Sequence, residues 1–141
     1  MTAARPDGTS TPGYSETMPC APESARRARQ LVATALEKWT FDDLTDTGTL
    51  IVSELVANAI AHTPCRLVHI CVRRTGEALV RIAVCDTSRA VPMRGTLGSG
   101  SEAGRGLLLV DALSDRWGYQ QRCRGKIVWA GMRPKAKEPT Q

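Results

Sequence analysis

One stretch constrains this chain more than any other, residues 49–62, which read Thr-Leu-Ile-Val-Ser-Glu-Leu-Val-Ala-Asn-Ala-Ile-Ala-His. Glu54, Asn58 and His62 interrupt an apolar run at intervals of four residues, so in a helix they line up along one face. Apolar side chains cover most of the remaining surface, which predicts a largely buried helix. A buried Glu and a buried Asn need polar partners, because burial without them is costly. The alternative is an amphipathic helix whose three polar residues meet solvent.

The length and composition predict one domain between two tails. The 141 residues suit a single core, and only 4% of them are aromatic, so Leu, Val, Ile and Ala must build that core. Residues 1–19 are rich in Thr, Pro, Gly and Ser, and residues 134–141 read Pro-Lys-Ala-Lys-Glu-Pro-Thr-Gln. Both segments are expected to be disordered, which leaves a domain at residues 20–133.

The charge pattern narrows the classes of partner. The net charge is +5, but the basic residues form no dense block and no aromatic residues are interleaved with them. This pattern argues against direct binding of nucleic acid. The mild basic excess fits an anionic small ligand or an acidic protein partner. No apolar stretch is long enough to span a membrane, so no membrane partner is expected.

The cysteines predict a reducing compartment. Their number is odd, no pair has the spacing of a zinc knuckle or a redox motif, and no signal peptide is recognised. We therefore expect reduced thiols in a cytoplasmic protein. Two of them lie in apolar strand-like runs and are expected to fill the core. The five are Cys20, Cys65, Cys71, Cys85 and Cys123, and the two core candidates are Cys71 and Cys85.

The hydrophobic periodicity predicts the order helix, helix, strand, strand, loop, helix, strand, strand. Strand pairs joined by tight turns indicate a mainly antiparallel, mixed sheet. Helices covering one of its faces would complete a two-layer α+β sandwich. The expected helices are 23–39, 49–62 and 106–114, and the expected strands are 66–73, 78–85, 117–122 and 126–132.

Two further motifs suggest a ligand site. Asp86 follows an apolar strand, where its carboxylate can accept hydrogen bonds from a ligand amine. The alternative is an Asp that caps a turn. Gly104-Arg105-Gly106-Leu107 opens a predicted helix after a glycine-containing loop. Backbone N–H groups at a helix start favour an anion, and Arg105 adds a cation. The alternative is a plain Gly-rich loop, because neither common phosphate-binding fingerprint is present.

Taken in this order, the motifs resemble the GHKL ATPases, the superfamily of gyrase and the histidine kinases. The spacing of Glu54, Asn58 and His62 resembles the N box of that superfamily. Asp86 followed by Pro92 is similar to its G1 box, and residues 104–110 are similar to its G2 region. The resemblance covers residues 23–132 and is greatest to small single-domain anti-sigma-factor serine kinases of bacteria. It implies a Bergerat-type ATP-binding fold.

The resemblance implies ATP and Mg²⁺ as cofactors. Asn58 would then be a metal ligand, since Mg²⁺ prefers oxygen ligands and phosphate. Glu54 would act as the general base on a serine or on water. Asp86 would accept the adenine amine, and His62 would have a supporting role near the phosphates. The other nucleotide-binding residues would be Ser88, which follows Asp86, and Gly104, Arg105, Gly106 and Leu107, which border the phosphates below a lid at residues 93–103.

The sequence departs from the family pattern beside the adenine site. Ser88 and Ala90 stand where the superfamily usually has glycines in its G1 box. Relatives often carry a Thr in the final hairpin that supports the adenine-binding Asp, and the matching position is read as Ile127. An Ile cannot donate a hydrogen bond, so Asp86 is expected to rely on Thr87, Ser88 or water. These changes bear on nucleotide affinity more than on the fold.

Three functional hypotheses follow from the resemblance. The first is a protein-serine kinase that also sequesters a sigma factor, is switched by an anti-sigma-factor antagonist, and works as a homodimer. The second is an ATP-dependent protein-binding module without kinase activity. The third is a basic interaction protein with a degenerate pocket. The presence of Glu54 favours the first over the second, because a module that only binds needs no base.

Overall fold

The computed structural model describes residues 5–6, 13–62, 66–75, 79–86, 102–122 and 125–134. Its helices are α1 (Ser24–Lys38), a short 3₁₀ helix (Asp42–Leu44), α2 (Thr45–His62) and α4 (Glu102–Leu113). Its strands are β1 (Arg5–Pro6), β2 (Gly13–Pro19), β3 (Leu67–Thr75), β4 (Leu79–Asp86), β5 (Arg116–Arg122) and β6 (Gly125–Met132).

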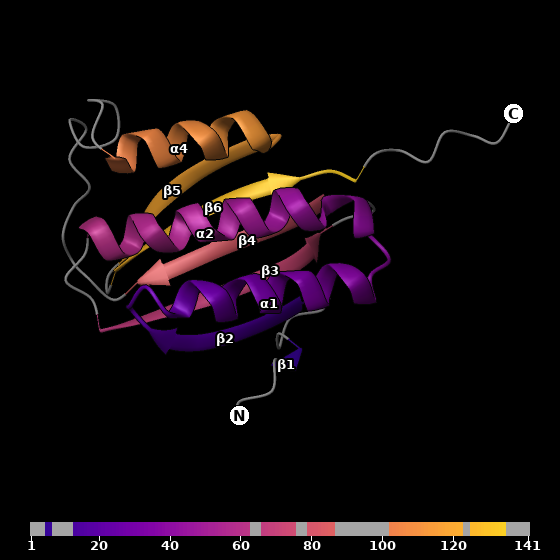
Figure 1. Ribbon diagram of the computed structural model, residues 1–141, viewed down its shortest axis with the longest axis horizontal. Coiled ribbons are helices and arrows are strands. Elements are labelled where there is room, and N and C mark those ends of the chain that lie inside the picture. Colours follow the sequence, from indigo (N-terminus) through magenta and orange to yellow (C-terminus); the bar gives the residue numbers. More distant parts are fainter. Residues whose placement is uncertain are drawn as a thin grey trace, which may run out of the picture.

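The strands form one sheet in the order β1-β2-β3-β4-β6-β5. The three α-helices lie on one face of this sheet, so the molecule has two layers (Figure 1). This confirms the predicted α+β sandwich. Each pair of neighbouring strands among the described residues is antiparallel, so the sheet is antiparallel here rather than mixed.

Aliphatic side chains fill the space between the sheet and the helices. Successive strand residues point to opposite faces, so alternate residues of β3 and β4 pack under the helices. Each of these side chains contributes roughly 1.5–3 kcal/mol on burial. They are Val68, Ile70, Val72, Val80, Ile82 and Val84, none more than 2% exposed, and α2 packs on them with Ile51, Val52, Leu55 and Val56, all at 0%.

A glycine allows α2 to pack closely on α1. A Cβ atom at Gly48 would lie 3.0 Å from Leu36 Cδ1 and 3.1 Å from Val32 Cγ1. Both distances are shorter than an ordinary van der Waals contact, so a Cβ at this position would require the Leu36 and Val32 side chains to shift. Helix α2 therefore lies in the middle of the helix layer, in contact with α1 on one side and α4 on the other (Figure 1).

The N-terminal tail is shorter than the sequence analysis predicted. Residues 13–19 were assigned to a disordered tail, but Gly13–Pro19 forms β2 and pairs with β3 along its whole length. The content of Thr, Pro, Gly and Ser was misleading, because the pairing with β3 orders this segment. In the structure Glu16 is 9% exposed and forms an ion pair with Arg27 of α1, while Met18 is buried in the core. The remaining tail residues 1–4, 7–12 and 135–141 lie outside the described residues.

Two helices begin earlier than predicted. Helix α2 starts at Thr45 instead of residue 49, directly after the 3₁₀ helix, and α4 starts at Glu102 instead of residue 106. The glycines at positions 104 and 106 lowered the expected helix propensity there. Gly104 and Arg105 therefore lie in the first turn of α4. Among the described helices, none has the length and apolar character needed to cross a membrane.

The prediction that the cysteines are all reduced is wrong for Cys20. Cys20 is disulfide-bonded, and its partner lies outside the described residues. Cys71 and Cys85 are free thiols, as expected. They do not fill the core, because they lie on the face of the sheet that the helices leave uncovered and are only partly buried. The odd cysteine count gave no reason to expect a disulfide.

Candidate functional site

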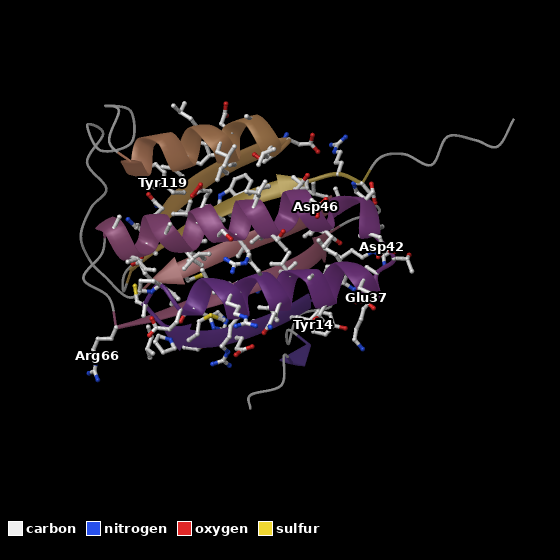
Figure 2. The ribbon with its side chains drawn as sticks, viewed as in Figure 1. Tyr14, Glu37, Asp42, Asp46, Arg66 and Tyr119 are labelled. Carbon is white, nitrogen blue, oxygen red and sulfur yellow. The ribbon has the colours of Figure 1, made fainter. Side chains whose placement is uncertain are left out.

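Four segments meet at one end of the molecule, on the left in Figure 1. They are the end of α2, the end of β4, the start of β6 and the start of α4, and α2 contacts each of the other three elements. The sheet register places Asp86, the last residue of β4, directly opposite Lys126 in β6. The acidic residues Glu37, Asp42 and Asp46 gather at the other end, where α1 leads into α2 (Figure 2). The described segments that carry predicted site residues therefore meet at the end away from that acidic group.

Asn58 lies in the last turns of α2 and is 4% exposed. Its Oδ1 atom is buried and accepts no hydrogen bond from the described part of the protein. A buried acceptor without a partner costs roughly 1–3 kcal/mol, so native proteins rarely leave one unsatisfied without a function. Within the described residues, the oxygen of Asn58 is thus a buried acceptor with the chemistry of a ligand atom.

Glu54 lies one turn before Asn58 on the same helix and is partly buried. The flanking Leu55 and Val56 are fully buried, so the helix cannot rotate without exposing them. The spacing of four residues then keeps the carboxylate on the same side of α2 as the Asn58 amide. His62 is the last residue of α2, and its side chain lies outside what the structure describes. Two of the three N-box-like residues are thereby placed together.

Asp86 ends β4 and is 6% exposed. It continues the alternation of Val80, Ile82 and Val84, so its carboxylate lies on the helix-covered face of the sheet. This position explains why a charged residue is buried at the end of an apolar strand. It also brings the carboxylate to the same layer of the molecule as α2.

The residue opposite Asp86 is Lys126, and not Ile127 as the sequence analysis assumed. Lys126 is 3% exposed and has the same strand parity as Val128 and Ala130, which pack under the helices. Ile127 is paired with Cys85 and lines a cavity on the opposite face of the sheet. Since side chains alternate along a strand, a shift of one residue moved the expected contact to the wrong face. Sequence reasoning therefore missed Lys126.

The start of α4 supplies backbone N–H groups at the same end of the molecule. The first four N–H groups of a helix have no partner within it, and the helix dipole favours negative charge there. Gly104, Arg105 and Gly106 belong to this start, but their side-chain positions lie outside the described residues. Leu107 is 2% exposed and packs in the core, and it lies beyond the first four residues of α4, so neither its side chain nor its N–H group is free for a ligand. Ser88 and the expected lid as far as residue 101 also lie outside the described residues.

A cavity of about 300 Å³ opens on the uncovered face of the sheet. Its lining includes His69, Cys71, Arg81, Cys85 and Ile127 but no residue assigned to the nucleotide or the metal. A hydrogen bond with Cys85, together with burial, raises the pKa of the Cys71 thiol well above its usual range. The guanidinium of Arg81 lies 4.3 Å from the centre of the Trp129 ring. The cavity and the predicted site are therefore on opposite faces.

Comparison with known proteins gives a family and a fold. The model of the histidine kinase-like ATPase domain matches residues 18–132. Among solved structures, the chain is similar to the histidine kinase domain of a blue-light activated histidine kinase from Erythrobacter litoralis EL346, with a TM-score of 0.51 and 18% identity. The match covers 83% of this chain and only 62% of that one. No curated protein matches the sequence. Because the family model spans most of the chain, the protein belongs to the histidine kinase-like ATPase domain family, of the GHKL type that its motifs resemble.

Proposed function

We propose that the protein binds ATP with Mg²⁺ at the end where α2, β4, β6 and α4 meet. The observation that carries this proposal is the buried Oδ1 atom of Asn58, which has no partner within the described residues. Membership in the histidine kinase-like ATPase domain family supports it, because the resemblance to the N box implies that Asn58 is a metal ligand. An amide oxygen is a suitable Mg²⁺ ligand, since this ion takes oxygen donors from protein, phosphate and water. The bound ion would screen the phosphate charges.

Asp86 is proposed to hold the adenine base. Its carboxylate is buried on the helix-covered face, where it can accept a hydrogen bond from the exocyclic amine of adenine. The start of α4 would then face the phosphates, with its free N–H groups and with Arg105 as a cation. Ser88 and His62 are proposed to contribute on the base side and the phosphate side, respectively.

Glu54 is the proposed general base. Its carboxylate would take the proton of a serine hydroxyl in a partner protein as the serine oxygen attacks the γ-phosphorus of ATP. The bond from that phosphorus to the β–γ bridging oxygen would break, which leaves ADP and phosphoserine. The partner is proposed to be an anti-sigma-factor antagonist, and the protein would also sequester a sigma factor. These roles come from the resemblance to anti-sigma-factor serine kinases.

The test is isothermal titration with ATP in the presence and absence of Mg²⁺. Wild-type protein should bind ATP more tightly with the ion, and Asn58→Ala should lose this dependence, since Ala has no ligand oxygen. Asn58→Asp should keep it, because a carboxylate also coordinates Mg²⁺. Gln30→Ala, on the exposed side of α1, is a control that should bind as wild type does.

Two outcomes would change the proposal. If Asn58→Ala binds Mg-ATP as wild type does, Asn58 is not the metal ligand. If the wild type binds Mg-ATP but transfers no phosphate to candidate partners and hydrolyses none, the protein is an ATP-dependent binding module without kinase activity.

A further inference from the structure

Lys126 is a buried cation that the proposed function leaves without a role. It is the second residue of β6 and is only 3% exposed. Lysine is rarely buried to this degree unless its ammonium group has a partner, because the loss of hydration is costly. Within the part of the chain that the structure describes, no ion pair or side-chain hydrogen bond of Lys126 is found. A lysine covered to this degree, at the end of the sheet where the nucleotide is proposed to bind, is well placed to donate to a bound ligand.

The sheet register places this donor beside the proposed base-binding carboxylate. Asp86 and Lys126 are directly opposite each other in neighbouring antiparallel strands, and both lie on the helix-covered face. The Cβ atoms of such a pair are about 4.5–5.5 Å apart. The long side chain of lysine can therefore reach any group that binds to the Asp86 carboxylate. The two side chains offer an acceptor and a donor next to each other.

We propose that Lys126 is a second base-recognition residue of this site. Its ammonium group donates a hydrogen bond to a ring nitrogen that flanks the amine of adenine, N1 or N7, while Asp86 accepts from the amine itself. This inference rests on the proposed function, because it requires the nucleotide to bind between α2 and the sheet. It corrects the prediction that the residue of β6 beside Asp86 is Ile127, whose side chain cannot donate a hydrogen bond.

The chemistry of the purines makes this pair selective. Adenine presents a donor, the amine, next to an acceptor, the ring nitrogen, and this order matches a carboxylate beside an ammonium. Guanine presents a carbonyl oxygen in place of the amine. That oxygen would face the Asp86 carboxylate, and two acceptors cannot share a hydrogen bond. If Lys126 donates to N1, the pair discriminates at two atoms of the base, because N1 of guanine carries a hydrogen. N7 is an acceptor in both purines, so with a contact to N7 only Asp86 discriminates.

The test uses two analogues of ATP that each lack one acceptor. In 1-deaza-ATP and 7-deaza-ATP the N1 or the N7 atom is replaced by a C–H group, and the phosphates are unchanged. Wild-type protein with Mg²⁺ should bind one of the two analogues roughly 10- to 150-fold more weakly than ATP, the range expected for a lost hydrogen bond to a charged group. Isothermal titration gives the affinities, so no enzymatic activity is needed.

The Lys126→Met variant tests whether Lys126 causes the weaker binding of the analogue. Methionine keeps much of the apolar stem and removes the donor, so the variant should bind ATP and both analogues with similar affinity. Lys126→Gln, which retains a donor, should restore part of the discrimination. Lys38→Met is the matched control, since Lys38 is exposed in the last turn of α1, and it should discriminate as wild type does. Thermal denaturation shows whether each variant is folded.

The outcomes separate this inference from the proposed function. If the wild type binds ATP and both analogues equally, Lys126 does not recognise a ring nitrogen, although the ATP site stands. Discrimination that persists in a folded Lys126→Met variant also overturns the inference. If the wild type binds neither ATP nor the analogues, the proposed function fails and the inference fails with it. If Lys126→Met does not fold, equal affinities of the wild type for ATP and both analogues would still overturn the inference.

Discussion

The two faces of the sheet differ in what their polar residues do. On the helix-covered face, three buried polar residues lie at one end, Asp86, Lys126 and Asn58, each at most 6% exposed. On the uncovered face, polar side chains run along the middle of the sheet and contact one another. His69 is hydrogen-bonded to Thr17 at 2.7 Å there. Burial with an unsatisfied acceptor marks the first face as the better candidate for a ligand site.

The comparison shows that a shift of one position along a strand moves a side chain to the other face of the sheet and into different surroundings. Asp86 and Cys85 are neighbours in sequence, and so are Lys126 and Ile127, yet each pair is divided between the two faces. Each neighbour is therefore a natural control for the other. A substitution that affects nucleotide binding on one face should leave it unchanged one residue away.

The largest expected effect is on the rate of phosphate transfer, which should depend on Glu54 and not on His69 on the uncovered face. Glu54→Gln should lower phosphate transfer about 10²–10⁴-fold without changing the affinity for ATP, because a general base acts in the transition state. His69→Gln, on the uncovered face, should leave the rate unchanged. Single-turnover transfer to a partner serine measures the rate, and titration measures the affinity. Normal turnover by Glu54→Gln would place the base elsewhere.

The second prediction compares two isoleucines in neighbouring strands. Ile82 is 0% exposed under the helices, so Ile82→Ala should lower the free energy of unfolding by about 2–5 kcal/mol. Ile127 is only partly buried in the wall of the outer cavity, so Ile127→Ala should cost less than half as much. Urea denaturation gives both values. Equal losses would mean that the uncovered face is packed as tightly as the core, for instance by a second copy of the chain.

The third prediction concerns the choice of base. Wild-type protein should prefer ATP over GTP, and Asp86→Ala should lose about 1–3 kcal/mol of that preference, the cost of an unsatisfied buried group. Cys85→Ala changes the preceding residue on the other face and should keep the preference. Competition between the two nucleotides measures it. A wild type that binds GTP as well as ATP would exclude Asp86 as an adenine-selecting residue.

The smallest expected effect is a pH dependence of stability that arises from Cys71 on the uncovered face. The pKa of Cys71 is raised in the folded protein, first by its hydrogen bond to Cys85 and then by burial. An unfolded cysteine ionises near pH 8.5, so above this pH the unfolded chain binds fewer protons than the folded one and stability falls as the pH rises. Urea denaturation at pH 7 and pH 9.5 should show a smaller fall for Cys71→Ser. A fall identical to that of the wild type would rule out this contribution.

The sequence was sufficient to predict the fold and the N-box-like helix. Long periodic stretches such as residues 49–62 determine their own burial, and residues four apart in a helix must share a face. The order of the predicted helices and strands agrees with the structure, although β1, β2 and the 3₁₀ helix were absent from it. Strand β2 was missed because it is held by its pairing with β3, a segment far away in the sequence.

The partner of Asp86 is harder to predict, because it depends on register. A resemblance between motifs placed Ile127 beside Asp86, and an error of one residue in a strand moves a side chain to the other face. The signal that would have corrected it is the alternation in β6. Val128, Ala130 and Met132 are apolar and buried, which assigns Lys126 to the same face as the core.

The most direct test of the ATP site is to observe which face responds to the nucleotide. Backbone amide resonances of the isotopically labelled protein would be recorded by NMR during a titration with Mg-ATP. The site described above predicts shifts concentrated at Asn58, Asp86 and Lys126, with little change at His69 and Arg81 on the uncovered face. Shifts concentrated around the outer cavity, with α2 and the end of β4 unaffected, would contradict it.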